Sequence, residues 1–146
     1  MTSEFGIAVH ALVYINRRNA TVCSETLSKT VCTNPARVRK IMARLKAAGL
    51  VGAKEGPDGG YFMVRQPESI TLDMLLFALD AQLITPGWHS GDLDMDCVVA
   101  SGMANVMEDL CHALNQSCLN YLRAISISDI DLRIFPNAPS GSKLAE

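Results

Sequence analysis

The sequence lacks any run that approaches the roughly 20 consecutive apolar residues of a membrane-spanning helix, although hydrophobic residues make up 49% of its 146 positions. Its first residues contain no basic stretch followed by an apolar block, so we expect no secretory signal. No segment repeats along the chain, which argues against a fibrous protein. The composition therefore favours one domain with a substantial core, with or without an oligomerisation element, and we expect it in the cytoplasm.

Patterns that carry catalysis or hold metals are also missing. The chain has no Ser-His-Asp order, no glycine-rich phosphate loop and no pair of carboxylates in an apolar setting. Of its three histidines, His10 lies among apolar neighbours and is expected in a core or an interface, and His112 has no partner at ligand spacing. A ligand or metal role for His89, beside Trp88, stays open as an alternative. We expect neither an enzyme nor a metal site.

The net charge of −2 conceals an uneven distribution. Residues 1–80 carry ten Lys or Arg and seven Asp or Glu, whereas residues 81–146 carry three and eight. The contrast is sharpest between Thr33 and Lys54, where six positive side chains occur without a negative one. Such a run is often only a solvated helix face, but a local basic surface on an acidic protein also indicates a polyanionic partner.

The basic stretch lies in a helix-turn-helix pattern. The apolar spacing predicts three helices in the first part of the chain, over residues 3–16, 24–30 and 35–48. Ser3 can cap the first of them, and Thr33 or Asn34 can cap the third. Pro35 suits the first position of the third helix, where the missing N–H costs nothing, and Gly49 suits its end. Two short helices separated by a tight turn, the second one basic, are typical of DNA-binding helix-turn-helix units.

A β-hairpin is expected directly after these helices. Residues 50–54 and 61–64 fit two strands, and the segment between them is dense in Gly, Pro and Asp, which form turns. A hairpin in this place is a wing, so the fold class is mainly α with a small β-hairpin wing. Thr71 can cap a further helix over residues 72–81, and we expect residues 83–97 to form a mobile loop.

A long helix is expected from residue 98 to about residue 125. Its apolar side chains recur every three or four residues, among them Val99, Met103, Val106, Leu110, Leu114 and Tyr121. A helix this long carries more apolar surface than a small domain can cover, so we expect these side chains to form a dimer interface. The predicted organisation is a winged helix-turn-helix domain, a mobile loop, a dimerisation region and a flexible tail, over residues 1–82, 83–97, 98–130 and 131–146.

Five motifs in this order resemble one known family. They are Ala11–Ile15, Thr33–Ile41, Leu45–Val51, Gly56–Tyr61 and Ile70–Leu72. Each motif is weak by itself, but their common order is specific. The chain resembles the bacterial Rrf-two family of winged-helix transcription regulators, of the IscR, NsrR and CymR type, over residues 1–82 with a continuation to about 130. The Thr-Asn-Pro turn looks most like the cluster-free branch.

The resemblance implies a homodimer that binds an imperfect palindrome near promoters. The helix after the Thr-Asn-Pro turn would enter the major groove, and the wing would touch the minor groove or the backbone. The candidate DNA-binding residues are Thr33, Asn34, Pro35, Arg37, Arg39, Lys40, Lys54, Gly59 and Gly60. Two general rules support these candidates: a helix N-terminus, where Thr33 and Asn34 are expected, suits a phosphate, and Arg is the commonest reader of guanine. Glu55 is a departure, because related proteins often carry Arg there and phosphate would repel a carboxylate.

The five cysteines leave a redox alternative open. Cluster-binding relatives carry three closely spaced cysteines before the long helix, whereas this chain has only Cys97 there, with Cys111 and Cys118 inside the helix. We therefore expect no iron–sulfur cluster and no other cofactor. Cys97 is the candidate redox thiol, although Asp94 and Asp96 beside it disfavour the reactive thiolate. Cys23 and Cys32, on either side of the short second helix, are expected to serve as packing residues.

The sequence thus predicts a sequence-specific transcription regulator, a repressor that acts as a homodimer on a palindromic promoter site. Its expected partners are double-stranded DNA and a second copy, with no membrane contact. Two alternatives remain: a redox-sensing regulator of the same family, which uses a cluster or a thiol, and a winged-helix module whose basic helix faces an acidic protein. Salt-dependent, sequence-selective binding to DNA separates the last alternative from the others.

Overall fold

The computed structural model describes residues 2–85, 87, 91–92 and 94–137. Its elements in chain order are α1 (Ser3–Arg18), α2 (Ser24–Val31), α3 (Pro35–Ala47), β1 (Val51–Lys54), β2 (Gly60–Met63), the 3-10 turn η1 (Pro67–Ser69), α4 (Leu72–Ala78), α5 (Val98–Arg123) and α6 (Ile127–Ile134). The predicted fold class, mainly α with one antiparallel hairpin, is confirmed. Within the described ranges, no helix combines the length and the hydropathy needed to cross a bilayer.

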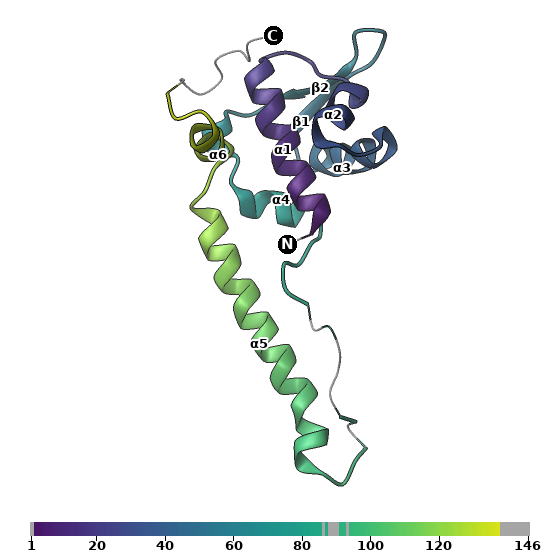
Figure 1. The fold of residues 1–146 in the computed structure, drawn as a ribbon, viewed down its shortest axis with the longest axis vertical. Helices are drawn as coiled ribbons and strands as arrows, with labels where there is room; N and C mark the ends of the chain where they lie inside the picture. Colours follow the sequence, from purple (N-terminus) through teal and green to yellow (C-terminus); the bar gives the residue numbers. More distant parts are fainter. Residues whose placement is uncertain (1, 86, 88–90, 93, 138–146) are drawn as a thin grey trace.

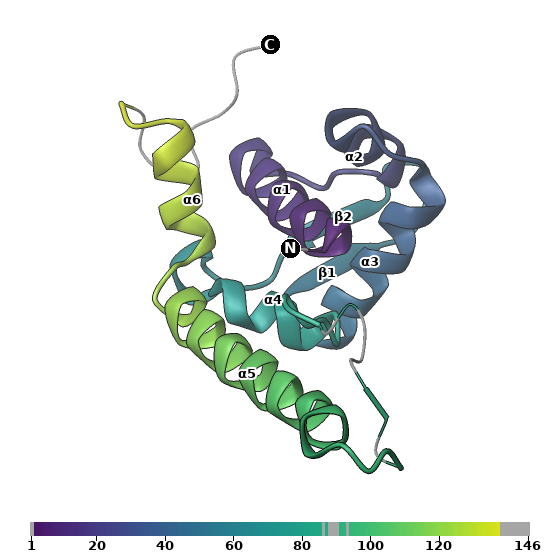
Figure 2. The ribbon, with the colours of Figure 1, turned by 60° about the horizontal axis from the view of Figure 1, so that its bottom comes forward.

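The helices α1 to α4 and the hairpin surround one core, and α5 projects from them as a long arm (Figure 1). In both views α2 and α3 lie on one side of α1, and α6 lies on its other side (Figure 2). Apolar side chains from several helices fill the core, among them Leu12, Leu27, Ile41, Met42 and Leu75. The helix-turn-helix and the wing are therefore held by one packed body.

The helix ends differ from the prediction by a few residues. Thr2 rather than Ser3 caps α1, because its hydroxyl accepts a hydrogen bond from the N–H of Phe5 at 3.4 Å. The helix continues to Arg18 and ends where Asn19 adopts a left-handed conformation with φ of 45°. The fourth helix, α4, ends three residues earlier than expected, shortly before the chain turns at Asp80, where φ is 43°.

The dimerisation region and the tail require a correction. The long helix ends at Arg123, and residues 127–134 form the separate helix α6, which packs against α1 and η1. A capping box begins α6: Ser126 N–H donates to the Asp129 carboxylate at 2.8 Å, and Asp129 N–H donates to the Ser126 hydroxyl at 3.1 Å. The prediction of a flexible tail from residue 131 is therefore wrong for residues 131–134.

A buried ion pair fastens α6 to α1. Nε of Arg17 lies 2.5 Å from Oδ1 of Asp131, and the two side chains are 2% and 0% exposed. The Arg17 guanidinium also lies over the ring of Phe135, 4.1 Å from its centroid. No local sequence pattern indicates this pair, because the two residues lie 114 positions apart in the chain. The pair fixes the last described helix on the domain.

The segment predicted as a mobile loop begins with two anchored residues. The side-chain oxygen of Asn115, in the middle of α5, accepts hydrogen bonds from the N–H groups of Leu83 and Ile84 at 3.2 and 3.1 Å. Its amide nitrogen donates to the carbonyl of Ile84 at 2.6 Å. These bonds tie the chain after α4 to α5. Trp88 and His89 lie outside the described residues, as do residues 138–146 of the tail.

Candidate nucleic-acid interface

A tight turn sets the direction of α3 relative to α2. Cys32 adopts a left-handed conformation with φ of 57°, and the N–H of Thr33 donates to a carbonyl of α2 at 3.0 Å. Asn34 then caps α3, because its side-chain oxygen accepts a hydrogen bond from the N–H of Arg37 at 2.8 Å. Pro35 is the first residue of the helix. The predicted start of this helix is confirmed, and Asn34 rather than Thr33 is its cap.

Most of the candidate DNA-binding residues lie at the N-terminal end of α3. The turn and the first two turns of the helix supply Thr33, Asn34, Pro35, Arg37, Arg39 and Lys40. The side of the helix that faces the domain is buried in the core through Val38, Ile41, Met42 and Leu45. The positive end of the helix dipole lies at the same end as these basic side chains. This end of α3 is therefore suited to a polyanion.

The basic side chains of α3 differ in their contacts within the protein. Lys40 is exposed. Arg44 forms an ion pair with Glu4 of α1 at 3.1 Å and donates to a carbonyl at the end of α4, so it fastens α3 to its neighbours. Arg37 donates through Nη2 to the hydroxyl of Ser3 at 2.5 Å. Arg44 is thus a structural residue, and the surface charge near the turn comes from the others.

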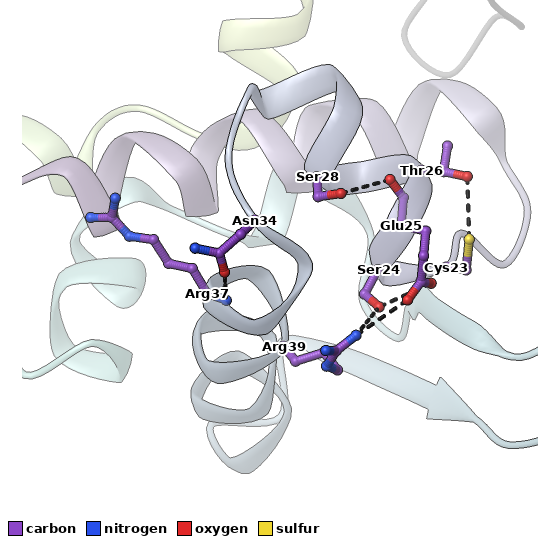
Figure 3. Close-up of polar contacts among 8 residues, drawn as sticks. All are labelled: Cys23, Ser24, Glu25, Thr26, Ser28, Asn34, Arg37 and Arg39. Carbon is purple, nitrogen blue, oxygen red and sulfur yellow. Dashed lines mark hydrogen bonds and ion pairs between the residues drawn. The ribbon is translucent and has the colours of Figure 1, made fainter.

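Arg39 belongs to a polar cluster with the first residues of α2 (Figure 3). Its Nη1 donates to Ser24 Oγ at 3.1 Å and to Glu25 Oε1 at 3.2 Å. The hydroxyl of Ser24 in turn donates to Glu25 Oε2 at 3.1 Å. Hydrogen bonds from its own backbone N–H and from Ser24 hold the pKa of Glu25 below its ordinary value. Sequence reasoning missed Ser24 and Glu25, whose only signal was their place at the start of a helix.

Cys23 directly precedes this cluster as the residue before α2. Its Sγ lies 3.2 Å from the hydroxyl of Thr26, and this contact lowers the pKa of the thiol. The side chain is partly exposed rather than buried. It is therefore not the simple packing residue that the sequence suggested.

The wing brings Lys54 and Gly60 opposite each other at the end of the hairpin. Lys54 and the neighbouring Glu55 are both exposed. Gly60 has φ of +149°, and a Cβ at this position would lie 2.4 Å from the carbonyl oxygen of Val22. Gly59 closes the turn, donating its N–H to a carbonyl of the wing loop at 2.9 Å. The turn and the packing against Val22 thus account for both glycines without a contact to DNA.

The predicted dimer face lies on the long arm. Of the 26 residues of α5, Leu122 is the one whose side chain is buried among those described. Five of the six predicted interface side chains are between 51% and 66% exposed: Val99, Val106, Leu110, Leu114 and Tyr121. The remaining one, Met103, is partly buried. Exposed apolar stripes of this extent mark an interaction surface.

A second apolar surface lies between α1 and α6. It is a groove of about 530 Å³, lined by Phe5, Gly6, Val9, His10, Val13, Tyr14, Arg17, Leu72, Leu122, Ile130, Ile134 and Phe135. His10, for which a core or interface position was expected, is exposed and lies at this groove rather than in the core. Sequence reasoning missed the groove because α6 supplies one of its walls.

Comparison with known proteins shows related regulators. The model of the Rrf2 family, described as iron-dependent transcriptional regulator, matches residues 1–131. YwnA of Bacillus subtilis, named as an HTH-type transcriptional regulator, is 24% identical over 135 residues, which are 92% of this chain and 99% of YwnA. The HTH-type transcriptional regulator IscR of Photobacterium profundum is 24% identical over 132 residues, covering 89% and 74% of the two chains. A solved transcriptional regulator from Lactobacillus plantarum shares the fold, with a TM-score of 0.80 at 20% identity, over 94% of this chain and 93% of that one.

Cys97, Cys111 and Cys118 lie too far apart along α5 to ligate one iron–sulfur cluster within one copy of the chain. Cys97 precedes α5 as its cap, and Cys111 and Cys118 lie 14 and 21 residues further along the helix. At 1.5 Å per residue these separations are about 21 and 32 Å, whereas the ligands of one cluster lie within a few ångströms of each other. Among the described residues, no group of three or more His, Cys, Asp or Glu side chains could hold a metal ion.

Proposed function

Because the chain belongs to the Rrf2 family of transcription regulators, we propose that it is a homodimeric repressor that binds a palindromic promoter site through α3 and the wing. The family consists of transcription regulators rather than enzymes, and this holds for the present chain. The observation that carries the finer proposal is the pair of exposed basic side chains, Arg39 and Lys40, on the first turns of α3, within a run from Thr33 to Lys54 that has no acidic residue, with the wing beside it.

The candidate contacts divide by chemistry. Thr33 and Asn34 lie at the helix N-terminus, where the positive end of the helix dipole suits a phosphate. Lys40 and Lys54 are exposed point charges and serve as phosphate anchors that position the protein. Arg39 carries a planar set of donors that can read a base edge in the major groove. In this proposal the lysines supply affinity and the arginine supplies sequence preference.

Two apolar surfaces support the homodimer. The stripe on α5 and the groove between α1 and α6 are exposed in one copy, and Leu122, near the end of α5, lines the groove. A second copy that covers them would hold two α3 helices at a fixed separation. Two half-sites spaced by multiples of about 10–10.5 base pairs follow from such an arrangement.

Regulation would act on the separation between the two α3 helices of the dimer. The bonds from Asn115 to the chain after α4 connect the DNA-binding domain to the long arm. A signal that changes the angle of α5 therefore moves both α3 helices relative to each other. Because its target is chromosomal DNA, the proposal places the protein in the cytoplasm.

The test is a selection of binding sequences from a library of randomised duplexes, followed by anisotropy titrations on the selected duplex and on a scrambled one. We expect an inverted repeat, at least about 10³-fold preference over the scrambled duplex, and affinity that falls steeply with salt. Lys40→Ala should weaken binding to both duplexes, whereas the exposed Arg133 on α6 supplies a control, since Arg133→Ala should change neither. Failure to enrich any sequence would contradict the proposal.

The thiol-sensing alternative rests on Cys97. Its thiol is free and exposed at the start of α5, where a modification could alter the arm. If a peroxide lowers DNA affinity in the wild type and not in Cys97→Ser, the regulator is a thiol sensor. An equal loss in both proteins assigns the effect to another residue.

A further inference from the structure

Arg39 has a guanidinium whose donors are only partly used inside the protein. Both of its contacts in the described part of the chain, to Ser24 Oγ and to Glu25 Oε1, come from Nη1. A guanidinium carries five N–H donors in a fixed plane, so the Nε–Nη2 edge keeps its donors. The side chain is 53% exposed although it is held. Arg39 is therefore fixed at one edge and accessible at the other.

The three groups close a triangle that defines one orientation. Ser24 Oγ accepts from Arg39 and donates to Glu25 Oε2, while Glu25 Oε1 accepts from Arg39. Each of the three groups thus bonds to the other two in a single arrangement of donors and acceptors. The carboxylate of Glu25 is ionised at neutral pH and so is a partner for the guanidinium, and hydrogen bonds from its own backbone N–H and from Ser24 lower its pKa further.

The start of α2, which carries Ser24 and Glu25, is itself rigidly supported. Val22 and Tyr61 exchange two backbone hydrogen bonds, at 2.9 and 2.8 Å, and so join this segment to the wing. The side chain of Ser24 is buried. A positioning group is useful only on such a support, because a loose partner would move with the arginine.

Arg37 does not share this arrangement. Its side chain extends to the other side of α3, away from the cluster (Figure 3), and donates to Ser3 of α1. Arg39 is thus the arginine near the turn that two side chains of α2 hold in place. Bidentate recognition of guanine requires a planar guanidinium in one orientation, and an arginine that is ordered beforehand loses less freedom on binding.

We propose that Glu25 and Ser24 are positioning residues that orient Arg39 for bidentate recognition of a guanine at one position of each half-site. The inference rests on the proposed function, since it requires α3 to enter the major groove. Glu25 is a carboxylate on the surface that faces phosphates, so it lowers affinity for DNA in general while it raises selectivity at one base pair.

The experiment measures affinity for the selected duplex, for duplexes with each base pair substituted in turn, and for a scrambled duplex. Wild type should discriminate at one G·C pair by about 5- to 150-fold. Arg39→Ala should remove this discrimination, and Glu25→Ala should reduce it several-fold while affinity for the scrambled duplex stays equal or rises. Glu25→Gln keeps an acceptor oxygen and should restore part of the discrimination.

Glu55→Ala is the matched control. Glu55 is also an exposed carboxylate beside the basic surface, so its removal should raise affinity for all duplexes equally and leave discrimination unchanged. If Glu25→Ala behaves like Glu55→Ala, Glu25 contributes only charge and the inference is overturned. If wild type is selective but Arg39→Ala keeps the full pattern, Arg39 is not the reader and the inference is also overturned. A wild type that selects no sequence refutes the proposed function itself.

Discussion

Removal of the carboxylate of Asp131 should destabilise the protein strongly. The partner that remains, Arg17, is 2% exposed, and its Nε lies 2.5 Å from the lost oxygen. Breaking a buried pair by deleting one member costs about 3–5 kcal/mol, because the other charge stays buried without its counterion. Against a total of about 5–15 kcal/mol this is a large fraction, and it corresponds to a fall in Tm of roughly 6–20 °C. We expect this for Asp131→Ala in urea and thermal unfolding at fixed protein concentration.

The controls separate the ion pair from the helix that carries it. Arg133 is an exposed charge on the same helix, so Arg133→Ala should stay within about 0.5 kcal/mol of wild type. Replacing both partners, as in Arg17→Met with Asp131→Leu, should recover most of the loss, since no unpaired charge remains. A free energy of unfolding for Asp131→Ala equal to that of Arg133→Ala would refute a buried pair and return residues 131–134 to a flexible tail.

Three further predictions concern the stability contributed by a glycine of the wing, the loss of stability at acid pH, and the dimer. Gly60→Ala should lower the free energy of unfolding by more than about 1 kcal/mol, because its Cβ would meet the carbonyl of Val22 at 2.4 Å; Gly102→Ala, with no neighbour within 4 Å, should raise it by about 0.5–1 kcal/mol. Burial alone would raise the pKa of Asp73, but hydrogen bonds outweigh it and place the pKa below 3.8. Its contribution is therefore full above about pH 4 and is lost as the pH falls through the lower folded-state pKa, so Asp73→Asn should flatten the acid limb of a stability-against-pH curve. Leu110→Asp should give monomers in light scattering, because it places a charge on the proposed interface, and a persistent dimer would locate the interface elsewhere.

Local signals predicted the DNA-binding half of the molecule well. The cap at Asn34 followed by Pro35, and the dense turn residues of the wing, are short-range patterns whose physics is complete within a few residues. They therefore gave the helix-turn-helix and the hairpin within one or two residues of their observed ends. The same holds for the long helix, whose apolar period extends over many residues.

Contacts between residues far apart in the chain could not be predicted from the sequence. Nothing local couples Arg17 to Asp131, so the tail was predicted as flexible although α6 is packed in place. The capping-box pattern of Ser126 and Asp129 is local and indicates the start of α6, but the prediction of a flexible tail did not take it into account. The contact of Arg39 with Glu25 likewise joins two helices across a turn, and residue type alone does not say which basic side chain is held and which is free.

The most direct test of the account is a hydroxyl-radical footprint of the protein on the duplex selected from the random library. A homodimer with one α3 in each of two major grooves protects two symmetric patches, separated by a multiple of about 10–10.5 base pairs and related by a two-fold axis. We predict that pattern. A single asymmetric patch, or equal protection along the whole duplex, would contradict the proposal that paired α3 helices read two half-sites.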